Sequence, residues 1–208
     1  MDFDPGTGLG PRLRSARSER GLSVRELARR VGCSPSLISQ IERGTSVPSV
    51  GILYSLATEL ASSLDHLVFG SSPPAASPAA AAPPGPAVAP APAASPAPGG
   101  VVQRAGCRQI IDLASGVRWE RLTPGDDQAV DFLEVVYSPG GHSTDERRPL
   151  RHDGREYGVV LSGTLVANVG FGSYELGPGD SIAFDSAMPH EYLNKTPDSV
   201  HAIWVVVR

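Results

Sequence analysis

Two sets of polar residues in the sequence have the types and the spacing to do chemistry. Between positions 36 and 43, serine, glutamine and arginine side chains alternate with apolar ones at helical spacing. Side chains of these types hydrogen-bond to phosphates and to the edges of bases. In the second half of the chain, His152 and Glu156 stand four residues apart and His190 follows. Imidazole nitrogens and carboxylate oxygens are metal ligands, so the sequence offers a candidate nucleic-acid surface and a candidate metal or ligand site.

The first set lies in a segment, residues 9–69, whose apolar positions recur at helical spacing. Gly32 can adopt the positive φ of a tight turn. Ser34 is a typical helix cap, and Pro35 suits the first position of a helix, where no amide hydrogen is needed. This pattern predicts four or five short helices, one of which spans residues 35–43.

The specific signal is a small residue and a turn glycine between apolar anchors, which two steeply crossing helices require. These residues are Leu27, Ala28, Gly32, Ile38 and Ile41. The stretch SVRELARRVGCSPSLISQIERGTSVPS (23–49) resembles the helix-turn-helix of the XRE family, which is similar to phage repressors. The resemblance covers about residues 9–69 and implies that the second helix of the pair enters the major groove of DNA.

The resemblance places DNA contacts on the helix over 35–43 and at the start of the helix before it. The candidate DNA-binding residues are Arg25, Ser34, Ser36, Ser39, Gln40 and Arg43. A merely solvated helix face would show the same spacing, and this alternative stays open for each residue. Residues 1–70 carry eight arginines against seven acidic residues, a net charge of only +1. Because one copy would bind weakly, we expect a homodimer that reads two operator half-sites about 34 Å apart in double-stranded DNA.

Residues 71–100 have the composition of a tether. They carry no charge and consist almost entirely of Ala, Pro, Ser and Gly, so they have nothing to bury and cannot form a continuous helix. Fully extended, they would span about 90 Å at about 3.1 Å per residue. We therefore expect a helix-turn-helix DNA-binding domain over 1–70, a disordered linker over 71–100 and a second domain over 101–208.

After residue 101 the pattern changes to short apolar runs separated by glycine and proline turns, which predicts an antiparallel sandwich or an eight-strand barrel. The runs are 110–111, 117–122, 132–137, 156–161, 164–169, 181–184, 190–193 and 202–207. Two segments, RHDGREYGVVLSGTL (151–165) and LGPGDSIAFDSAMPHEYLN (176–194), resemble the two motifs of the cupin superfamily. His152 and Glu156 fall in register with the first motif and His190 with the second, whereas Leu150 stands where the family has its first histidine.

Together the resemblances imply a multidomain α + β protein. Its N-terminal part is an all-α, lambda-repressor-like helix-turn-helix, and its C-terminal part is an all-β cupin barrel of the jelly-roll type. Residues 152 and 156 share one face of a strand, so inward-pointing strands would bring His152, Glu156 and His190 together. Two imidazoles and one carboxylate suffice in number for an iron, zinc or manganese site. The missing ligand favours a metal-free pocket instead, in which His152 and Glu156 hydrogen-bond to each other and His190 caps a turn.

The combination resembles XRE-cupin transcriptional regulators. It implies a sequence-specific DNA-binding regulator without catalytic residues, whose cupin domain dimerises and senses a small-molecule effector. A metal-dependent cupin enzyme fused to a DNA-binding module and a purely structural dimerisation domain remain alternatives. A tether of this composition is no rigid lever, so we expect the effector to change dimerisation or the docking of the helices against the barrel.

The composition also indicates the cellular compartment in which the protein is expected. The formal net charge is −4, and the only two cysteines, Cys33 and Cys107, match no metal-ligand spacing and lie in separate predicted domains. This favours a reducing cytoplasm. Neither a signal peptide nor a membrane-spanning helix is expected, and the strong preference for arginine over lysine is typical of a GC-rich bacterial genome.

Overall fold

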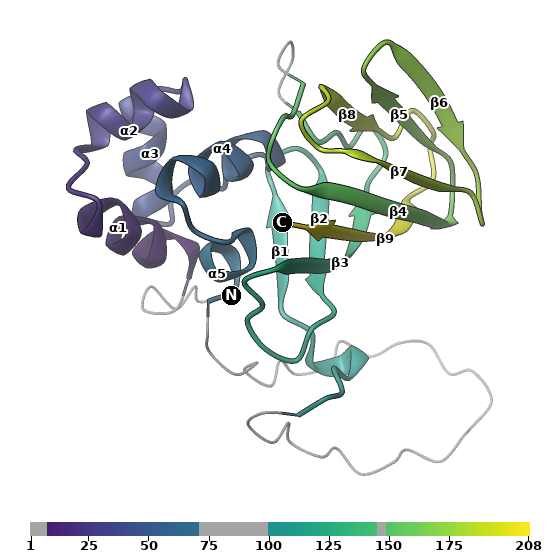
Figure 1. Cartoon of the computed structure of the whole chain (residues 1–208), viewed down its shortest axis with the longest axis horizontal. Coiled ribbons are helices and arrows are strands. Elements are labelled where there is room, and N and C mark those ends of the chain that lie inside the picture. The colour runs from purple at the N-terminus through teal and green to yellow at the C-terminus, as the bar shows by residue number, and fades with distance from the viewer. Residues whose placement is uncertain (1–7, 71–99, 145–148) are drawn as a thin grey trace.

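The computed structural model of the chain describes residues 8–70, 100–144 and 149–208. Apart from Gly100, the predicted linker lies outside these residues, which Figure 1 draws in colour. The described chain contains a helical region before the linker and a β region after it.

Five α-helices make up the helical region. They are α1 (Leu9–Glu19), α2 (Val24–Val31), α3 (Pro35–Glu42), α4 (Val50–Leu60) and α5 (Leu64–Val68). Serine hydroxyls cap four of them: the side chain of Ser23, Ser34, Ser49 or Ser63 accepts a hydrogen bond from the amide three residues later. Gly32 has φ 77° between α2 and α3, as the turn requires. None of the described helices has the length and apolarity to cross a bilayer.

Nine strands make up the β region. They are β1 (Ile110–Leu113), β2 (Val117–Arg121), β3 (Val130–Tyr137), β4 (Arg155–Ser162), β5 (Leu165–Val169), β6 (Gly172–Leu176), β7 (Ser181–Asp185), β8 (His190–Leu193) and β9 (Val200–Val207). They form antiparallel sheets in the orders β1-β2-β3-β9-β4-β7 and β6-β5-β8. These two sheets make a jelly-roll sandwich, and no ladder among the described strands closes them into one continuous barrel. The sequence did not predict β6, because most of its residues are exposed and form no apolar run.

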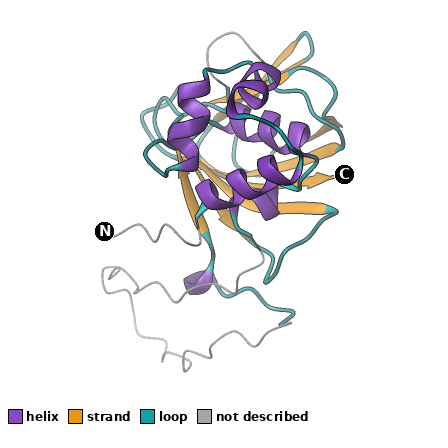
Figure 2. Ribbon diagram, turned by 90° about the vertical axis from the view of Figure 1, so that its left-hand side faces the viewer, coloured by secondary structure: helices purple, strands orange, loops and turns teal. Residues whose placement is uncertain are grey.

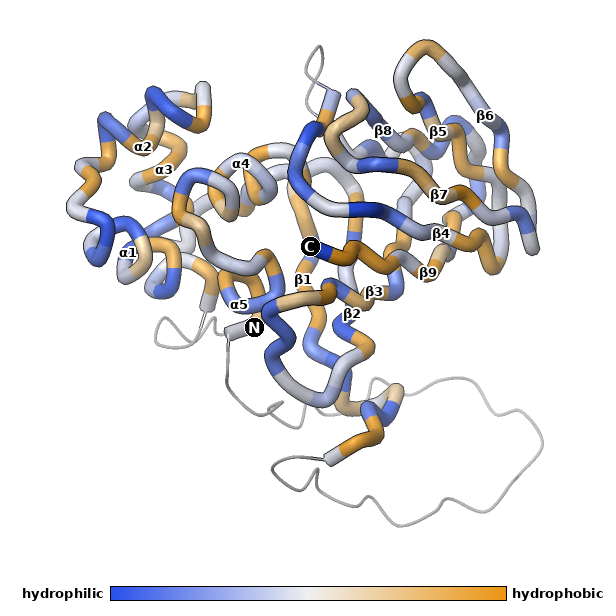
Figure 3. The backbone as a smooth tube through the Cα atoms, viewed as in Figure 1, coloured by the Kyte–Doolittle hydropathy of each residue, from blue (hydrophilic) through white to orange (hydrophobic). Residues whose placement is uncertain are grey.

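Burial alternates along β9, although Figure 3 shows that most of this strand is hydrophobic. The inward residues of that strand, Val200, Ala202, Trp204 and Val206, are buried while their neighbours are less so. Alternation of this kind identifies the face of the six-stranded sheet that turns toward the core.

Two different elements pack on the inner face of the six-stranded sheet, one at each end. At one end β8 lies over it, where the Tyr192 hydroxyl and Trp204 Nε1 meet at the same carboxylate of β4. At the other end α4 and α5 take the place of a second sheet: Arg121 of β2 pairs with Asp65 of α5. Figure 2 shows the helices in front of the strands. The helical region therefore completes the enclosure that the three-stranded sheet leaves open.

Candidate functional site

The candidate DNA-binding residues lie on the side of α3 that does not pack. Ile38 and Ile41 are 0% and 1% exposed, and they fix that helix against the helical core. Ser36 and Arg43 are exposed, while Ser39 and Gln40 are partly exposed. Arg25 is exposed at the start of α2. The predicted residues thus share one accessible side of the helix pair.

Some of these side chains also make contacts within the helical region. The Ser34 hydroxyl accepts a hydrogen bond from the Leu37 amide at 3.1 Å, so it caps α3. The Arg43 guanidinium donates to the Ser39 hydroxyl at 2.7 Å. This bond orients Arg43 along the helix and leaves its other donors available to a phosphate or a base.

The orientation of α3 depends on α1, which sequence reasoning did not use. The Arg17 guanidinium binds both carboxylate oxygens of Glu42, at 2.5 and 3.1 Å. Gly10 permits a close approach, because a Cβ there would lie 2.6 Å from the Ile41 carbonyl oxygen. An arginine and a glycine in the first helix therefore set the angle at which the candidate DNA surface is presented.

The second candidate set converges inside the β region. His152 precedes β4, Glu156 lies on β4 and His190 begins β8. The Nε2 atoms of His152 and His190 lie 2.8 and 3.0 Å from Glu156 Oε1. Their side chains are 5%, 0% and 2% exposed, in the order His152, His190, Glu156. The structure brings together all three residues that the sequence singled out.

The protonation pattern of this triad fits a cation. Each imidazole has its Nδ1 beside a backbone carbonyl oxygen, Asp153 at 3.0 Å for His152 and Met188 at 2.8 Å for His190. A carbonyl oxygen only accepts, so each Nδ1 carries a proton, and each Nε2 is directed at Glu156 Oε1. All three of these buried atoms lack a hydrogen-bond partner of acceptable geometry. A buried group of three acceptors is stable only with a positive charge between them or on the rings.

Glu156 is held in place by its other oxygen. Oε2 accepts hydrogen bonds of 2.7 Å from both the Tyr192 hydroxyl and Trp204 Nε1. Burial would raise the pKa of Glu156, but the contacts with His152 and His190 outweigh it and leave that pKa well below its ordinary value. The carboxylate is therefore ionised, with Oε1 turned toward the two imidazoles.

The spacing of the three atoms also suits a metal. Ligand atoms about 2.1 Å from a metal and at right angles to one another lie about 3.0 Å apart. The two distances from Glu156 Oε1 are close to this value, and all three ligand atoms lie within 4.8 Å of one another. Partners behind each ligand, here two carbonyls, a phenol and an indole, are typical of metal centres. The residues present thus fit a divalent metal with two histidines and one carboxylate.

Two further residues, Leu150 and Gly158, shape the surroundings of the triad. Leu150, at the position of the family's first histidine, is buried and lines the small interior cavity beside Glu156. Gly158 leaves space for an indole, because a Cβ there would lie 2.2 Å from the Trp204 ring. That glycine lets Trp204 lie across β4 and reach Glu156.

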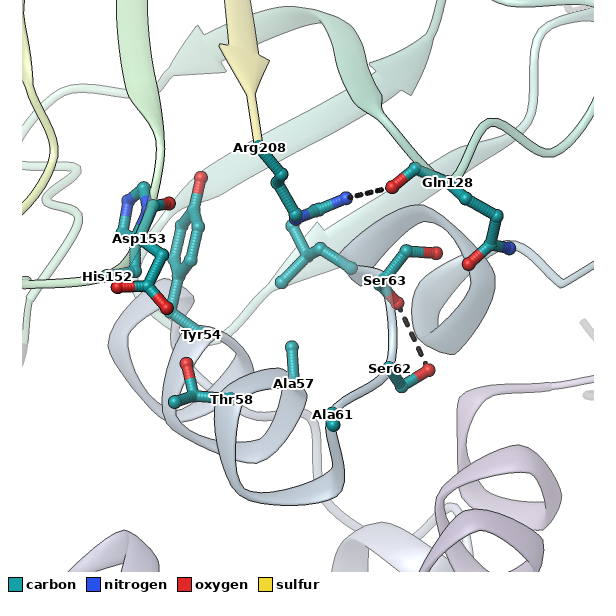
Figure 4. Close-up of a pocket in the computed structure, with 11 residues that line it drawn as sticks. Tyr54, Ala57, Thr58, Ala61, Ser62, Ser63, Gln128, His152, Asp153 and Arg208 are labelled. Carbon is teal, nitrogen blue, oxygen red and sulfur yellow. Dashed lines mark hydrogen bonds between the residues drawn. The ribbon is translucent and has the colours of Figure 1, made fainter.

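Tyr54 is the residue that sequence reasoning missed. It belongs to α4, yet its ring stacks on the His152 ring with centroids 4.1 Å apart and an interplanar angle of 8°. Figure 4 shows Tyr54 beside His152, with Arg208 across a cavity of about 320 Å³ between α4, α5 and the β region. Helical spacing predicts which side of α4 is apolar, but nothing in the spacing indicates that one of its residues reaches a cupin histidine.

Known proteins resemble the chain in both regions. Residues 9–67 match the family model of a helix-turn-helix domain, and residues 133–206 match that of a cupin domain. HTH-type transcriptional regulator SutR of Escherichia coli (strain K12) is 35% identical over 194 residues, which cover 93% of this chain and 90% of that protein. HTH-type transcriptional regulator PuuR of the same organism is 29% identical over 193 residues, 92% of this chain and 90% of that protein. The crystal structure of an HTH_3 family transcriptional regulator from Vibrio cholerae shares the fold, with TM-score 0.64, 22% identity and coverage of 97% of this chain and 96% of that one.

Proposed function

From the premise that the chain belongs to the HTH-type transcriptional regulators and carries a cupin domain, we propose that it reads a paired operator as a homodimer while its cupin domain senses a small-molecule effector. The observation that carries the proposal is the junction of the two regions: a helix of the DNA-binding region contacts a ligand-type histidine of the cupin. Residues 1–70 are the reader in this proposal, 71–100 the linker and 101–208 the sensor.

The exposed side of α3 is the reading surface. Gln40 has the amide geometry to pair with an adenine edge, and Arg43 can bind a guanine or a phosphate. Arg25 suits the DNA backbone, and the serines suit phosphates or bases. The residues proposed to contact DNA are Arg25, Ser34, Ser36, Ser39, Gln40 and Arg43.

The triad is the proposed sensor centre. His152, Glu156 and His190 would hold iron, zinc or manganese, and Tyr192 and Trp204 would orient the carboxylate. Such a metal would offer open coordination positions to an oxygen-bearing effector. Sensing requires only that the effector binds one arrangement of the two regions better than another, since a ligand shifts an equilibrium by its differential affinity.

The contacts between the regions favour a reversible docking. Besides the Tyr54 stack, they include ion pairs of Arg121 with Asp65 and of His66 with Asp126, both at 3.2 Å. The amide of Ala114 donates to the Pro48 carbonyl at 3.3 Å. Polar contacts of this kind, beside apolar ones, are typical of domains that move relative to each other.

Selection of genomic fragments tests the DNA-binding function. The purified full-length chain is mixed with sheared chromosomal DNA of its own source at low ionic strength, and the retained fragments are sequenced. We expect a small number of enriched sites with two related half-sites about one helical turn apart. Uniform retention or no retention of the genome would overturn the proposal.

One observation favours a second candidate, a metal-dependent enzyme. Two histidines and one carboxylate leave coordination positions open, as oxygen-using iron enzymes require. Against it, the cavity beside Glu156 has only about 20 Å³, room for roughly one water, while Tyr54 lies over His152. Oxygen uptake by iron-loaded protein with candidate metabolites would distinguish an enzyme from a sensor.

A further inference from the structure

Tyr54 occupies a place where a ligand of the cupin domain would be expected. Its ring lies parallel to His152, and its edge meets the Trp119 ring with centroids 6.1 Å apart. It borders the interior cavity beside Glu156 and also the cavity of about 320 Å³ between the two regions. A side chain of the DNA-binding region thus separates the triad from the space through which a small molecule would arrive.

Tyr54 leaves no room for an organic ligand at the triad. The interior cavity, about 20 Å³, is lined by Tyr54, Trp119 and Glu156 among others, and it holds no more than about one water. Small-molecule sites usually need about 300 Å³ or more. A metabolite can therefore reach the triad from this side only after the Tyr54 ring has moved.

We propose that Tyr54 is an internal ligand of the cupin domain: a small aromatic molecule of about the size of a phenol competes with its ring for the seat between His152 and Trp119, and its binding undocks α4 and α5 from the β region. This inference rests on the proposed function and names the class of effector. The seat selects a flat ring because one wall is a parallel imidazole and another is an indole at 77° to it.

The helix that carries Tyr54 transmits the displacement. Leu53 and Leu56, on either side of Tyr54 in the sequence, are fully buried in the helical region, so the backbone of α4 moves together with that core. Polar contacts then remain between α5 and the sheet: the Asp65–Arg121 pair, and the Asp65 amide that donates to Asp131 at 3.3 Å. Polar partners regain hydrogen bonds in water when they separate, so loss of the aromatic contact shifts the equilibrium toward the undocked state.

Binding of 4-methylphenol, which has the shape of the tyrosine side chain, tests the competition. Calorimetric titration compares the full-length protein with Tyr54→Ala, which empties the seat, and with Tyr54→Phe, which keeps the ring. Tyr174→Ala, at an exposed tyrosine of β6, is the matched control. We expect Tyr54→Ala to bind the probe at least tenfold more tightly than the wild type, and the other two variants to behave as the wild type. Equal affinities, or no binding to either protein, would overturn the internal-ligand proposal.

Hydrogen exchange tests the undocking and needs no variant. Saturating 4-methylphenol should speed amide exchange at least tenfold in residues 50–68 of the wild type, while residues 152–160 become better protected. If the ring simply rotated out of its seat, the probe would bind and exchange in residues 50–68 would not change. That result would overturn the coupling.

The two failures are distinguishable. Selective retention of genomic fragments without probe is measured on the same preparation. Retention without a probe effect refutes the role of Tyr54 and leaves the regulator standing, whereas loss of selective retention refutes the proposed function whatever the probe does.

Discussion

The helical region has two sides with opposite chemistry. On the α3 side, Ser36 and Arg43 are exposed to solvent among the described residues. On the α4–α5 side, Asp65 forms an ion pair with Arg121 in which both side chains are 2% exposed. Polar groups on the α3 side remain accessible to water. Polar groups on the α4–α5 side lost their hydration when the two regions docked.

This difference separates the residues that can bind a partner from those that stabilise the docking of the two regions. An exposed polar side chain has little effect on the free energy of unfolding and remains available to a partner, so it suits a surface that contacts DNA. A buried charge is stable only with its partner in place, so it holds one particular docking geometry. The same helical region therefore has an accessible polar surface, which we propose for DNA, and a geometrically demanding surface against the β region.

The largest expected change in the free energy of unfolding comes from removing one partner of the buried Asp65–Arg121 ion pair. Asp65→Ala leaves the Arg121 guanidinium unpaired, and removal of one partner of a buried pair typically costs about 3–5 kcal/mol. The free energy of unfolding is measured by denaturant titration at pH 8, where Asp65 is ionised although burial raises its pKa to about 7. The double variant Asp65→Leu with Arg121→Met is the control and should recover most of the loss. A change below about 0.5 kcal/mol in the single variant would contradict a buried pair.

Breaking the exposed side should change DNA binding and leave folding intact. Gln40→Ala removes an amide proposed to read a base edge, and we expect a loss of about 1–3 kcal/mol in binding free energy. Fluorescence anisotropy on a fragment selected from the genome measures it, with a melting temperature as the check on folding. Gln103→Ala, in the β region, is the matched control. Unchanged affinity at every salt concentration would show that Gln40 is only solvated.

The triad sharpens the comparison, because it is a buried polar site that we propose to bind a metal. Tyr192→Phe removes the hydroxyl that donates to Glu156 Oε2 while keeping the ring. Loss of such a partner usually weakens metal binding about 10–100-fold. Competition with a chelator measures the affinity for zinc or manganese, and Tyr174→Phe is the control. Equal affinity in both variants would mean that Tyr192 does not orient the carboxylate.

The smallest effect is expected at an exposed ion pair. Hydrogen bonds from Arg29 and then Arg30 lower the pKa of Glu26 to about 2. A lowered pKa stabilises the folded state above the unfolded pKa of about 4.3, and that contribution disappears as the pH falls toward 2. The melting temperature of Glu26→Gln should therefore lie slightly below that of the wild type at pH 6, and the two should converge near pH 2. Glu175→Gln, on an exposed strand, should show no such convergence.

The chain itself specifies its local elements well. Capping serines, the turn glycine and apolar spacing predicted the helices, because each of these signals acts within a few residues. The apolar runs predicted eight strands, and β6 was missed because an exposed strand lacks the alternation that burial imposes.

The sequence predicted the three residues of the triad but not the residues that surround them. The motifs indicated His152, Glu156 and His190, but the prediction that residues 152 and 156 share one face of a strand was wrong, because His152 lies before β4. The orienting roles of Tyr192 and Trp204 required the structure, since β4, β8 and β9 meet through pairings between residues far apart in the sequence.

By itself, the sequence determined which residues of α3 share its exposed side, because a helix places residues three and four apart on one side whatever else the chain does. Only the tertiary structure decided that Tyr54 lies on His152 and that Asp65 meets Arg121. Those contacts join residues on opposite sides of an Ala/Pro segment that transmits no geometry, so they depend on how two separately patterned surfaces fit together in space.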